Sequence, residues 1–116
     1  MTGWLRADAD KWGGHPVARR VADAEPRGRV RLTGIVRSAE VARIGGAPAL
    51  RCVLDDVTGE IALLFIGRER VPGMVPGAVC TVEGTARPEQ AQRGVSTGRI
   101  LVIWNPLYRF EAAHGG

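Results

Sequence analysis

The stretch LDDVTGEIALLFIGRERVPG, residues 54–73, decides how the sequence is interpreted. Two aspartates and a glycine near its start supply the side-chain acceptors and the positive φ that tight turns need. The apolar run 61–66 that follows is typical of a strand with apolar side chains on both faces. Residues 68–77 then contain two Pro-Gly steps and cannot form the interior of a strand. The stretch therefore predicts a strand, a turn, a second strand and a short connector.

Alternating patterns on either side of this stretch predict further strands. In residues 29–36, Val30, Leu32 and Ile35 lie among polar neighbours, and Gly34 interrupts the alternation as a bulge or bend does. Other segments with strand patterns are 50–56, 78–86, which contains Gly84, and 99–110, which is stopped at Asn105-Pro106. Residues 42–49 contain Gly45, Gly46 and Pro48 and predict a loop or hairpin.

Length and composition indicate a single small domain. The chain has 116 residues, of which 45% are hydrophobic and 24% charged, as in ordinary soluble globular proteins. The longest apolar run, residues 61–66, is far shorter than the roughly 20 residues of a membrane span. The N-terminus carries no apolar segment typical of a secretory signal. We therefore expect a cytoplasmic protein.

The two cysteines, Cys52 and Cys80, lie 28 positions apart and belong to no C-x-x-C pair. Only His15 and His114 would be left to join them as metal ligands, and structural metal sites usually need four. Both cysteines have apolar neighbours, so we expect reduced thiols in the core, with a disulfide as the less favoured alternative. No metal or cofactor is predicted.

Five strands, two of them interrupted by glycine, favour a small closed barrel over a sandwich, which normally needs about seven strands. Glycine bends allow a long strand to turn the corner of a barrel. This is the arrangement of the OB-fold, a five-stranded barrel. The prediction is an all-β protein with a five-stranded OB-fold barrel at residues 29–110, an N-terminal lead-in at 1–28 and a C-terminal tail at 111–116.

The lead-in differs in pattern from the rest of the chain. A short helix is predicted there, with Thr2 as its N-cap and Gly13-Gly14 as its end, followed by an extended segment. Trp4 and Trp12 are expected to anchor this segment onto the barrel.

Three stretches, VRLTGIV (30–36), LDDVTGEIALLFIG (54–67) and VPGAVCTVEG (75–84), together resemble the OB-fold family that includes the anticodon-binding domain of class II aminoacyl-tRNA synthetases. GRILVIWNPLYRF (98–110) is similar to the end of the wedge domain of the RecG branched-DNA helicase, where a strand runs into a His-Pro-x-Tyr stop. Asn105 stands in place of that histidine. The motor motif G-x-x-x-x-G-K-[ST] occurs nowhere, so this similarity extends to the wedge alone.

As a whole, the chain most resembles the small stand-alone OB-fold proteins of high-GC bacteria that are described as nucleic-acid binding. The resemblance implies a non-catalytic module for single-stranded or branched DNA, with RNA as the less favoured ligand. The net charge is +4, and fifteen of the sixteen basic residues are arginine. Arginine suits phosphates and bases, but the charge is spread thinly and supports only a weak preference for polyanions.

OB-folds bind oligonucleotides across strands two and three and between the loops that join strands one–two and four–five. On that pattern the candidate binding residues are Arg51, Val53 and Leu64 on the outward face, Arg43 in the first loop, Arg87, Arg93 and Arg99 in the second, and Trp104 at the end of strand five. The competing interpretation, of equal weight, is that these arginines are merely solvated loop residues.

Aromatic side chains decide how strong such binding is. Base stacking contributes roughly 1–3 kcal/mol per base in single-strand binders. Val53 and Leu64 occupy the places where a stacking aromatic is expected, so we expect modest affinity driven by phosphate contacts. Two roles stay open for Trp104: exposed, it stacks on a base or wedges a junction, and buried, it plugs the barrel end. Tyr108 and Phe110 are expected to be buried.

Catalysis has little support in the sequence. General acid–base chemistry needs a carboxylate pair or a histidine with an orienting partner. Asp55 and Asp56 are adjacent, which places them on opposite faces of a strand, and as turn residues they are expected to cap backbone amides. We expect no enzyme.

The alternative function is a protein-interaction or assembly module that does not bind nucleic acid. Its surface would be the apolar side chains of Val53, Ala62, Leu64 and Ile66, and its partner another protein or a second copy of the chain.

Overall fold

The computed structural model describes residues 17–89 and 100–111, and these are almost entirely β. The elements in chain order are a 3-10 turn η1 (Val21–Asp23) and the strands β1 (Arg29–Ile44), β2 (Ala47–Asp55), β3 (Glu60–Ile66), β4 (Val79–Pro88), β5 (Leu101–Trp104) and β6 (Leu107–Phe110). The predicted all-β class is confirmed. The predicted helix that starts at Thr2, together with Trp4 and Trp12, lies outside the described residues.

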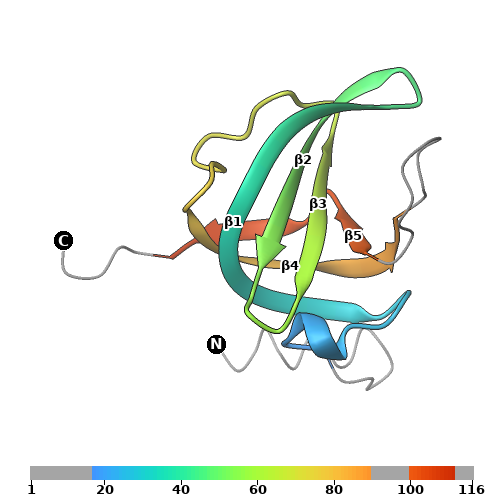
Figure 1. Cartoon of the computed structure of the whole chain (residues 1–116). Helices are drawn as coiled ribbons and strands as arrows, with labels where there is room; N and C mark the ends of the chain where they lie inside the picture. Colours follow the sequence, from blue (N-terminus) through green and yellow to red (C-terminus); the bar gives the residue numbers. More distant parts are fainter. Residues whose placement is uncertain (1–16, 90–99, 112–116) are drawn as a thin grey trace.

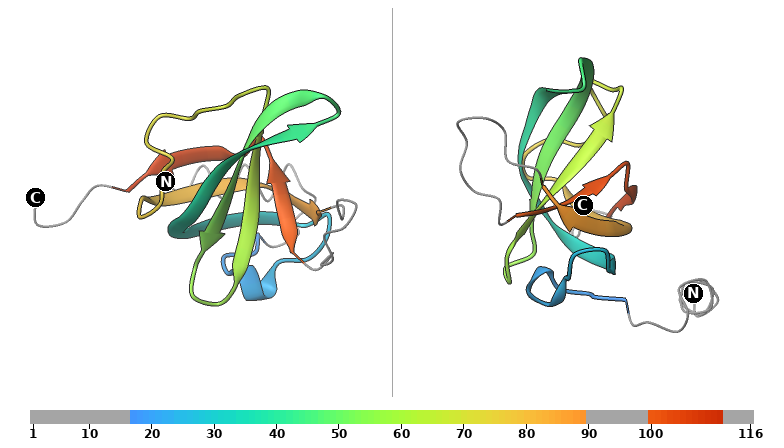
Figure 2. Two further views of the ribbon diagram at one scale, coloured as in Figure 1. Left: turned by 45° about the horizontal axis from the view of Figure 1, so that its top comes forward. Right: turned by 90° about the vertical axis from the view of Figure 1, so that its right-hand side faces the viewer.

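Five of the strands close into a ring (Figure 1). β1 pairs with both β2 and β4, β2 pairs with β3, β3 with β5, and β5 with β4. All of these pairs are antiparallel except β3–β5, which is parallel. The β1–β2 hairpin turns at Gly45-Gly46, as the sequence predicts, and projects beyond the ring in both views of Figure 2.

β1 belongs to two halves of the ring because it changes partner near its middle. Residues 29–35 pair with β4, and residues 35–44 pair with β2. A Cβ at Gly34 would lie 2.5 Å from the carbonyl oxygen of Asp55, so only glycine permits this approach. The predicted bend is therefore real, but the register shift lies between Val36 and Ser38. The alternation passes through Gly34 to Val36, which is buried, whereas Ile35 is 37% exposed.

β6 is a strand that the sequence pattern did not separate from β5. The predicted stop at Asn105-Pro106 ends β5, and the chain then pairs with residues 80–83 of β4. β1 pairs with one edge of β4, and β5 and β6 share the other edge. Both are needed there because β5 is short and pairs only with residues 86–88 of β4.

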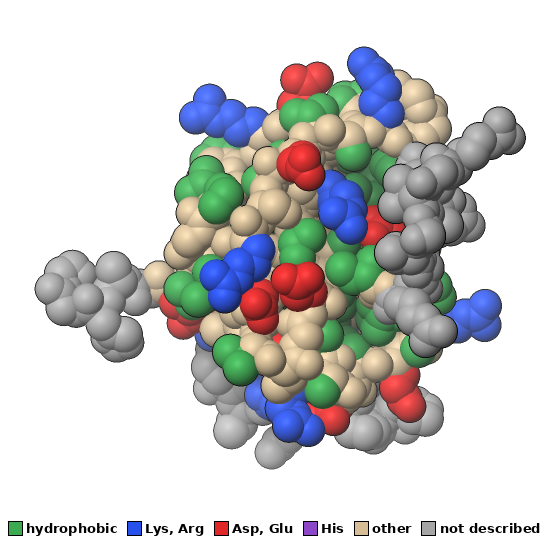
Figure 3. All heavy atoms as spheres, viewed as in Figure 1, with side chains coloured by type: hydrophobic (Ala, Val, Ile, Leu, Met, Phe, Trp, Pro, Cys, Tyr) green, Lys and Arg blue, Asp and Glu red, His purple; other side chains and the backbone are tan. Residues whose placement is uncertain are grey.

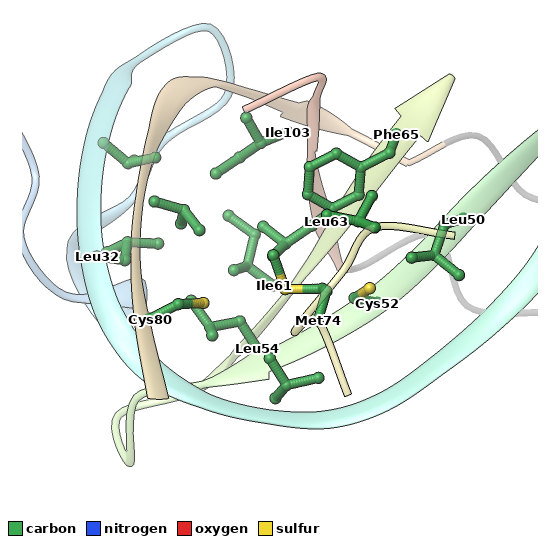
Figure 4. Packing of buried hydrophobic residues seen from close by; sticks show 14 of the residues in the cluster. Leu32, Leu50, Cys52, Leu54, Ile61, Leu63, Phe65, Met74, Cys80 and Ile103 are labelled. Carbon is green, nitrogen blue, oxygen red and sulfur yellow. The ribbon is translucent and has the colours of Figure 1, made fainter. Parts of the chain in front are cut away.

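The core fills the ring with aliphatic side chains from every strand of the ring and from the connector between β3 and β4 (Figure 4). Val71 and Met74 of that connector are each only 2% exposed, so a segment without regular structure still contributes to the core. Cys52 and Cys80 are free and fully buried, which confirms the prediction of reduced core thiols. Burial raises the pKa of each thiol to about 11.

The acidic turn between β2 and β3 also holds the lead-in. Asp55 Oδ1 accepts a hydrogen bond from the Val57 amide (2.7 Å), and Asp56 Oδ1 accepts one from the Thr58 amide (2.9 Å), as predicted for capping aspartates. The other oxygen of Asp56 accepts from the Val21 amide at 2.8 Å, and the Thr58 hydroxyl accepts from the Ala22 amide at 3.0 Å. The same turn therefore fixes η1 against the ring.

Replacing Gly34 by alanine should destabilise the protein by about 3 kcal/mol, at the upper end of overpacking costs, because backbone atoms of β2 must move. Urea unfolding measures the loss. The matched control is Gly45→Ala, where φ is +59° and nothing lies within 4 Å of the added Cβ. That change should cost only about 1 kcal/mol of left-handed strain. Equal losses in the two variants would show that the approach at Gly34 is not limiting.

Candidate nucleic-acid interface

A hollow of about 440 Å³ lies where the β1–β2 hairpin faces the ends of β4 and β5. Its described lining comes from four strands and the hairpin turn: Arg43, Ile44, Gly45, Leu64, Arg87, Pro88, Glu89, Val102 and Trp104. Four of the predicted binding residues, Arg43, Leu64, Arg87 and Trp104, are therefore brought together, although up to 61 positions separate them in the sequence. The hairpin and the ends of β4 and β5 lie on the right-hand side of Figure 1.

Leu64 and Val102, on the floor of the hollow, belong to a small apolar cluster on the outer face of the ring. Ala49, Ala62, Leu64 and Val102 form it, and all four are buried. The parallel pairing of β3 with β5 sets Ala62 beside Val102 and Leu64 beside Trp104. Leu64 is only 4% exposed, so the expectation that it and Ala62 present an open apolar face was wrong. Val53, further along β2, is half-buried.

Trp104 lies at the surface, with 46% of its area exposed, so it is not a buried plug at the end of the ring. The guanidinium carbon of Arg87 stands 5.0 Å from the centroid of its ring, a cation–π arrangement. This face of the ring is therefore in contact with the side chain of Arg87. Trp104 therefore has the exposure that base stacking needs.

Asn105 fixes the end of β5 beside the hollow, a role that the sequence analysis missed. It adopts a left-handed backbone with φ of 50°, which asparagine tolerates better than most residues. Its amide donates to the Leu64 carbonyl at 2.7 Å, and its side-chain oxygen accepts from the Ile66 amide at 2.8 Å. The Asn-Pro step that marked the strand end was the available signal, because asparagine is common where φ is positive.

Arg51 of β2 stands beside the hollow and is held by Glu89. Arg51 Nε and Nη2 each donate to one oxygen of that carboxylate, and both distances are 2.8 Å. The hydrogen bond to Glu89 raises the pKa of the Arg51 guanidinium above its ordinary value. In the sequence Glu89 is a single negative charge among arginines. It pairs with a residue 38 positions away, and no pattern near either residue indicates this contact.

Arg43 and Arg87 are the cations that remain available in the hollow. Arg43 Nη1 donates to the Gly46 carbonyl at 2.9 Å, and Arg87 stacks on Trp104. Neither forms an ion pair with any residue in the described part of the chain. Both are exposed and can reach an anion. Arg93 and Arg99 lie outside the described residues.

Tyr108 and Phe110 were expected to be buried, and the structure corrects this. Their exposed fractions are 36% and 39%. Tyr108 packs edge-to-face between Phe65 and Phe110, with centroid distances of 5.5 and 5.7 Å. The two rings are partly exposed, and β6, which carries them, is the last strand in the sheet order. They stand apart from the residues that line the hollow.

Charged side chains of both signs alternate over the face of the molecule shown in Figure 3. Among the described residues, no group of three or more His, Cys, Asp or Glu side chains is placed to hold a metal ion. Within residues 17–89 and 100–111, no helix has the length and apolar character needed to cross a membrane.

No family model matches this sequence, and no curated protein is similar to it at a significant level.

Replacing Asn105 by alanine should destabilise the protein by about 2 kcal/mol, since it removes one hydrogen bond and adds left-handed strain. Chemical unfolding followed by tryptophan fluorescence measures this loss. Asn105→Gly is the matched control, because glycine keeps the backbone conformation and loses only the side-chain hydrogen bond, at a cost of about 1 kcal/mol. Wild-type stability in the alanine variant would contradict the assigned role.

Proposed function

We propose that this chain is an OB-fold module that binds single-stranded or branched DNA, with RNA as the less favoured ligand, and that it is not an enzyme. One observation carries the proposal: Arg43, Arg87 and an exposed Trp104 converge in a single hollow between the β1–β2 hairpin and the ends of β4 and β5. Those are the loops and the face that OB-folds use for oligonucleotides. The strand order β1-β2-β3-β5-β4, closed by β1–β4, supports the fold assignment.

The chemistry of the hollow suits a nucleotide better than an apolar ligand. Two arginines free of ion pairs offer charge-assisted hydrogen bonds to phosphate oxygens. Trp104 offers a ring on which a base stacks in the place that the Arg87 guanidinium now takes. The buried floor under Leu64 and Val102 excludes water beneath the bound base. Arg43 and Arg87 are thus the phosphate contacts, and Trp104 is the stacking residue.

The mixed charge of the surface favours modest affinity. Binding through two phosphate contacts gives a slope of log K against log salt of about −1.4 for a single strand. A protein with this site releases its ligand readily as salt rises, which suits transient contact in the cytoplasm, the compartment we propose for it.

A protein-docking function is the second candidate, on a surface different from the one first expected. Two of the four apolar residues that were to form its contact face, Ala62 and Leu64, are buried. Several exposed apolar side chains lie instead on β6 and the nearby connector, where Leu107 is 61% and Val75 is 55% exposed. Light scattering after gel filtration tests this function, and a stable dimer that the change Leu107→Ser dissolves would support it.

Fluorescence anisotropy with labelled single-stranded DNA, forked DNA, duplex DNA and single-stranded RNA, at low and moderate salt, tests the proposed function. We expect salt-sensitive binding that is tightest for the single-stranded or forked DNA. Flat curves for all four probes at low salt would refute it.

The double variant Arg43→Ala/Arg87→Ala should lose at least tenfold in affinity for the single strand, and its salt slope should approach zero, because both phosphate contacts are gone. The matched control is Arg68→Ala/Arg70→Ala, which removes the same charge from exposed positions in the β3–β4 connector. Equal losses in the two variants would show a general charge effect and would move the site elsewhere.

Trp104→Ala should weaken binding by roughly five- to a hundredfold, the range of one lost base stack, while the melting temperature falls by only a few degrees. Trp104→Phe should retain most of the affinity because a phenyl ring still stacks. Circular dichroism confirms that both variants fold. If the alanine variant binds as tightly as the wild type, Trp104 has no stacking role.

A further inference from the structure

Each arginine around the hollow already has an intramolecular partner, and the three partners differ in kind. Arg43 donates to a backbone carbonyl, Arg87 lies on the ring of Trp104, and Arg51 holds the carboxylate of Glu89. The first two contacts leave the positive charge uncompensated. The third neutralises the charge of Arg51, which lies on β2.

The pairing of Arg51 with Glu89 has the geometry that an arginine uses for phosphate. Nε and Nη2 donate in parallel to two oxygens, each at 2.8 Å. A phosphodiester presents two non-bridging oxygens to the same fork, so carboxylate and phosphate compete for one set of donors. Arg51 lies opposite Leu64 in the β2–β3 register, and Leu64 lies opposite Trp104 in the β3–β5 register. A nucleic-acid strand with a base stacked on Trp104 therefore passes close to Arg51.

The Arg51–Glu89 pair can exchange its partner, unlike the contact of Arg29 with Glu83, in which two guanidinium nitrogens donate to one carboxylate oxygen. The side chains of Arg51 and Glu89 are 31% and 24% exposed, and a partly exposed ion pair contributes little to stability. Arg29 and Glu83 are 13% and 1% exposed, which makes that pair structural because separating it leaves a buried charge. The two pairs therefore have different roles.

The backbone of Glu89 is held independently of its side chain. Its amide donates to the Ile100 carbonyl at 3.1 Å, which continues the β4–β5 ladder by one residue. Glu89 also lines the hollow, so a carboxylate that leaves Arg51 remains close to the bound anion. Its repulsion then lowers the affinity of the site for phosphate.

We propose that the Glu89 carboxylate is an internal stand-in for a backbone phosphate: it occupies the phosphate site at Arg51 and keeps nucleic acid from making a third phosphate contact there unless it is displaced. This inference rests on the proposed function and adds to it a built-in brake on affinity. The hollow binds a nucleotide through Arg43, Arg87 and Trp104, and the next phosphate reaches Arg51 only in exchange for Glu89.

The test is the affinity of Glu89→Gln for a labelled single-stranded oligothymidylate, measured by anisotropy over a range of salt. The variant should bind about two- to fivefold more tightly than wild type, the range expected for one partly exposed ion pair. Its salt slope should steepen by about 0.7, one further phosphate contact on a single strand. In Arg51→Ala/Glu89→Gln, both the gain and the steeper slope should vanish.

Glu40→Gln is the matched control. Glu40 is exposed and lies opposite Arg51 in the backbone register of β1 and β2. The ion pair of Arg51 is with Glu89 and not with Glu40. The change therefore removes an equal charge nearby without freeing the guanidinium. Its salt slope should equal that of the wild type.

Three results overturn the inference. In the first, Glu89→Gln binds no more tightly than Glu40→Gln. In the second, the gain persists without Arg51. If wild-type binding still depends on Arg43 and Arg87, either of these results refutes the role of Glu89 and leaves the proposed function standing. In the third, neither wild type nor Glu89→Gln binds the oligonucleotide at low salt, and the proposed function fails together with the inference.

Discussion

The ring depends on the approach of β1 to the end of β2 at Gly34, where a side chain would collide with the carbonyl of Asp55. Only because this point is free of a Cβ can one strand of 16 residues pair with β4 on one side and with β2 on the other. The same bend directs the far half of β1 outward as the hairpin that carries Arg43. The closure of the ring and the position of the hairpin side of the hollow thus have the same steric cause.

The side of the hollow that carries Trp104 depends on a different constraint, the short parallel contact between β3 and β5. Four residue pairs make up that contact, and the last of them places Trp104 beside Leu64. Asn105 then fastens the end of β5 to both the carbonyl of Leu64 and the amide of Ile66. Since the tryptophan is held by the backbone of its neighbour, its ring can stay exposed without being loose.

Local patterns in the sequence predicted much of the fold. The alternation predicted the strands of the ring, the pair Gly45-Gly46 predicted the hairpin, and the adjacent aspartates predicted the capped turn of residues 55–59. Four of the eight predicted binding residues line the hollow. These features succeed because period-two patterning and turn chemistry are encoded within a few consecutive residues.

The errors arose where burial depends on contacts between distant strands. Leu64 alternates as an outward residue should, yet β5 and its own cluster cover it. Tyr108 and Phe110 look like core aromatics but lie on a strand with one open edge. The pairing of Arg51 with Glu89 joins residues 38 positions apart, and no pattern in either neighbourhood indicates it. Such contacts follow from the closure of the ring and not from local propensity.

The two buried thiols have a practical consequence for following the motions of the protein. Cys52 and Cys80 are its only cysteines, both lie inside the ring, and a pKa of about 11 leaves almost no thiolate at neutral pH. An alkylating reagent therefore modifies them only when the strands around them separate. The chain carries its own probe of ring opening, and a cysteine introduced on the surface could be labelled in the native state without first removing the natural two.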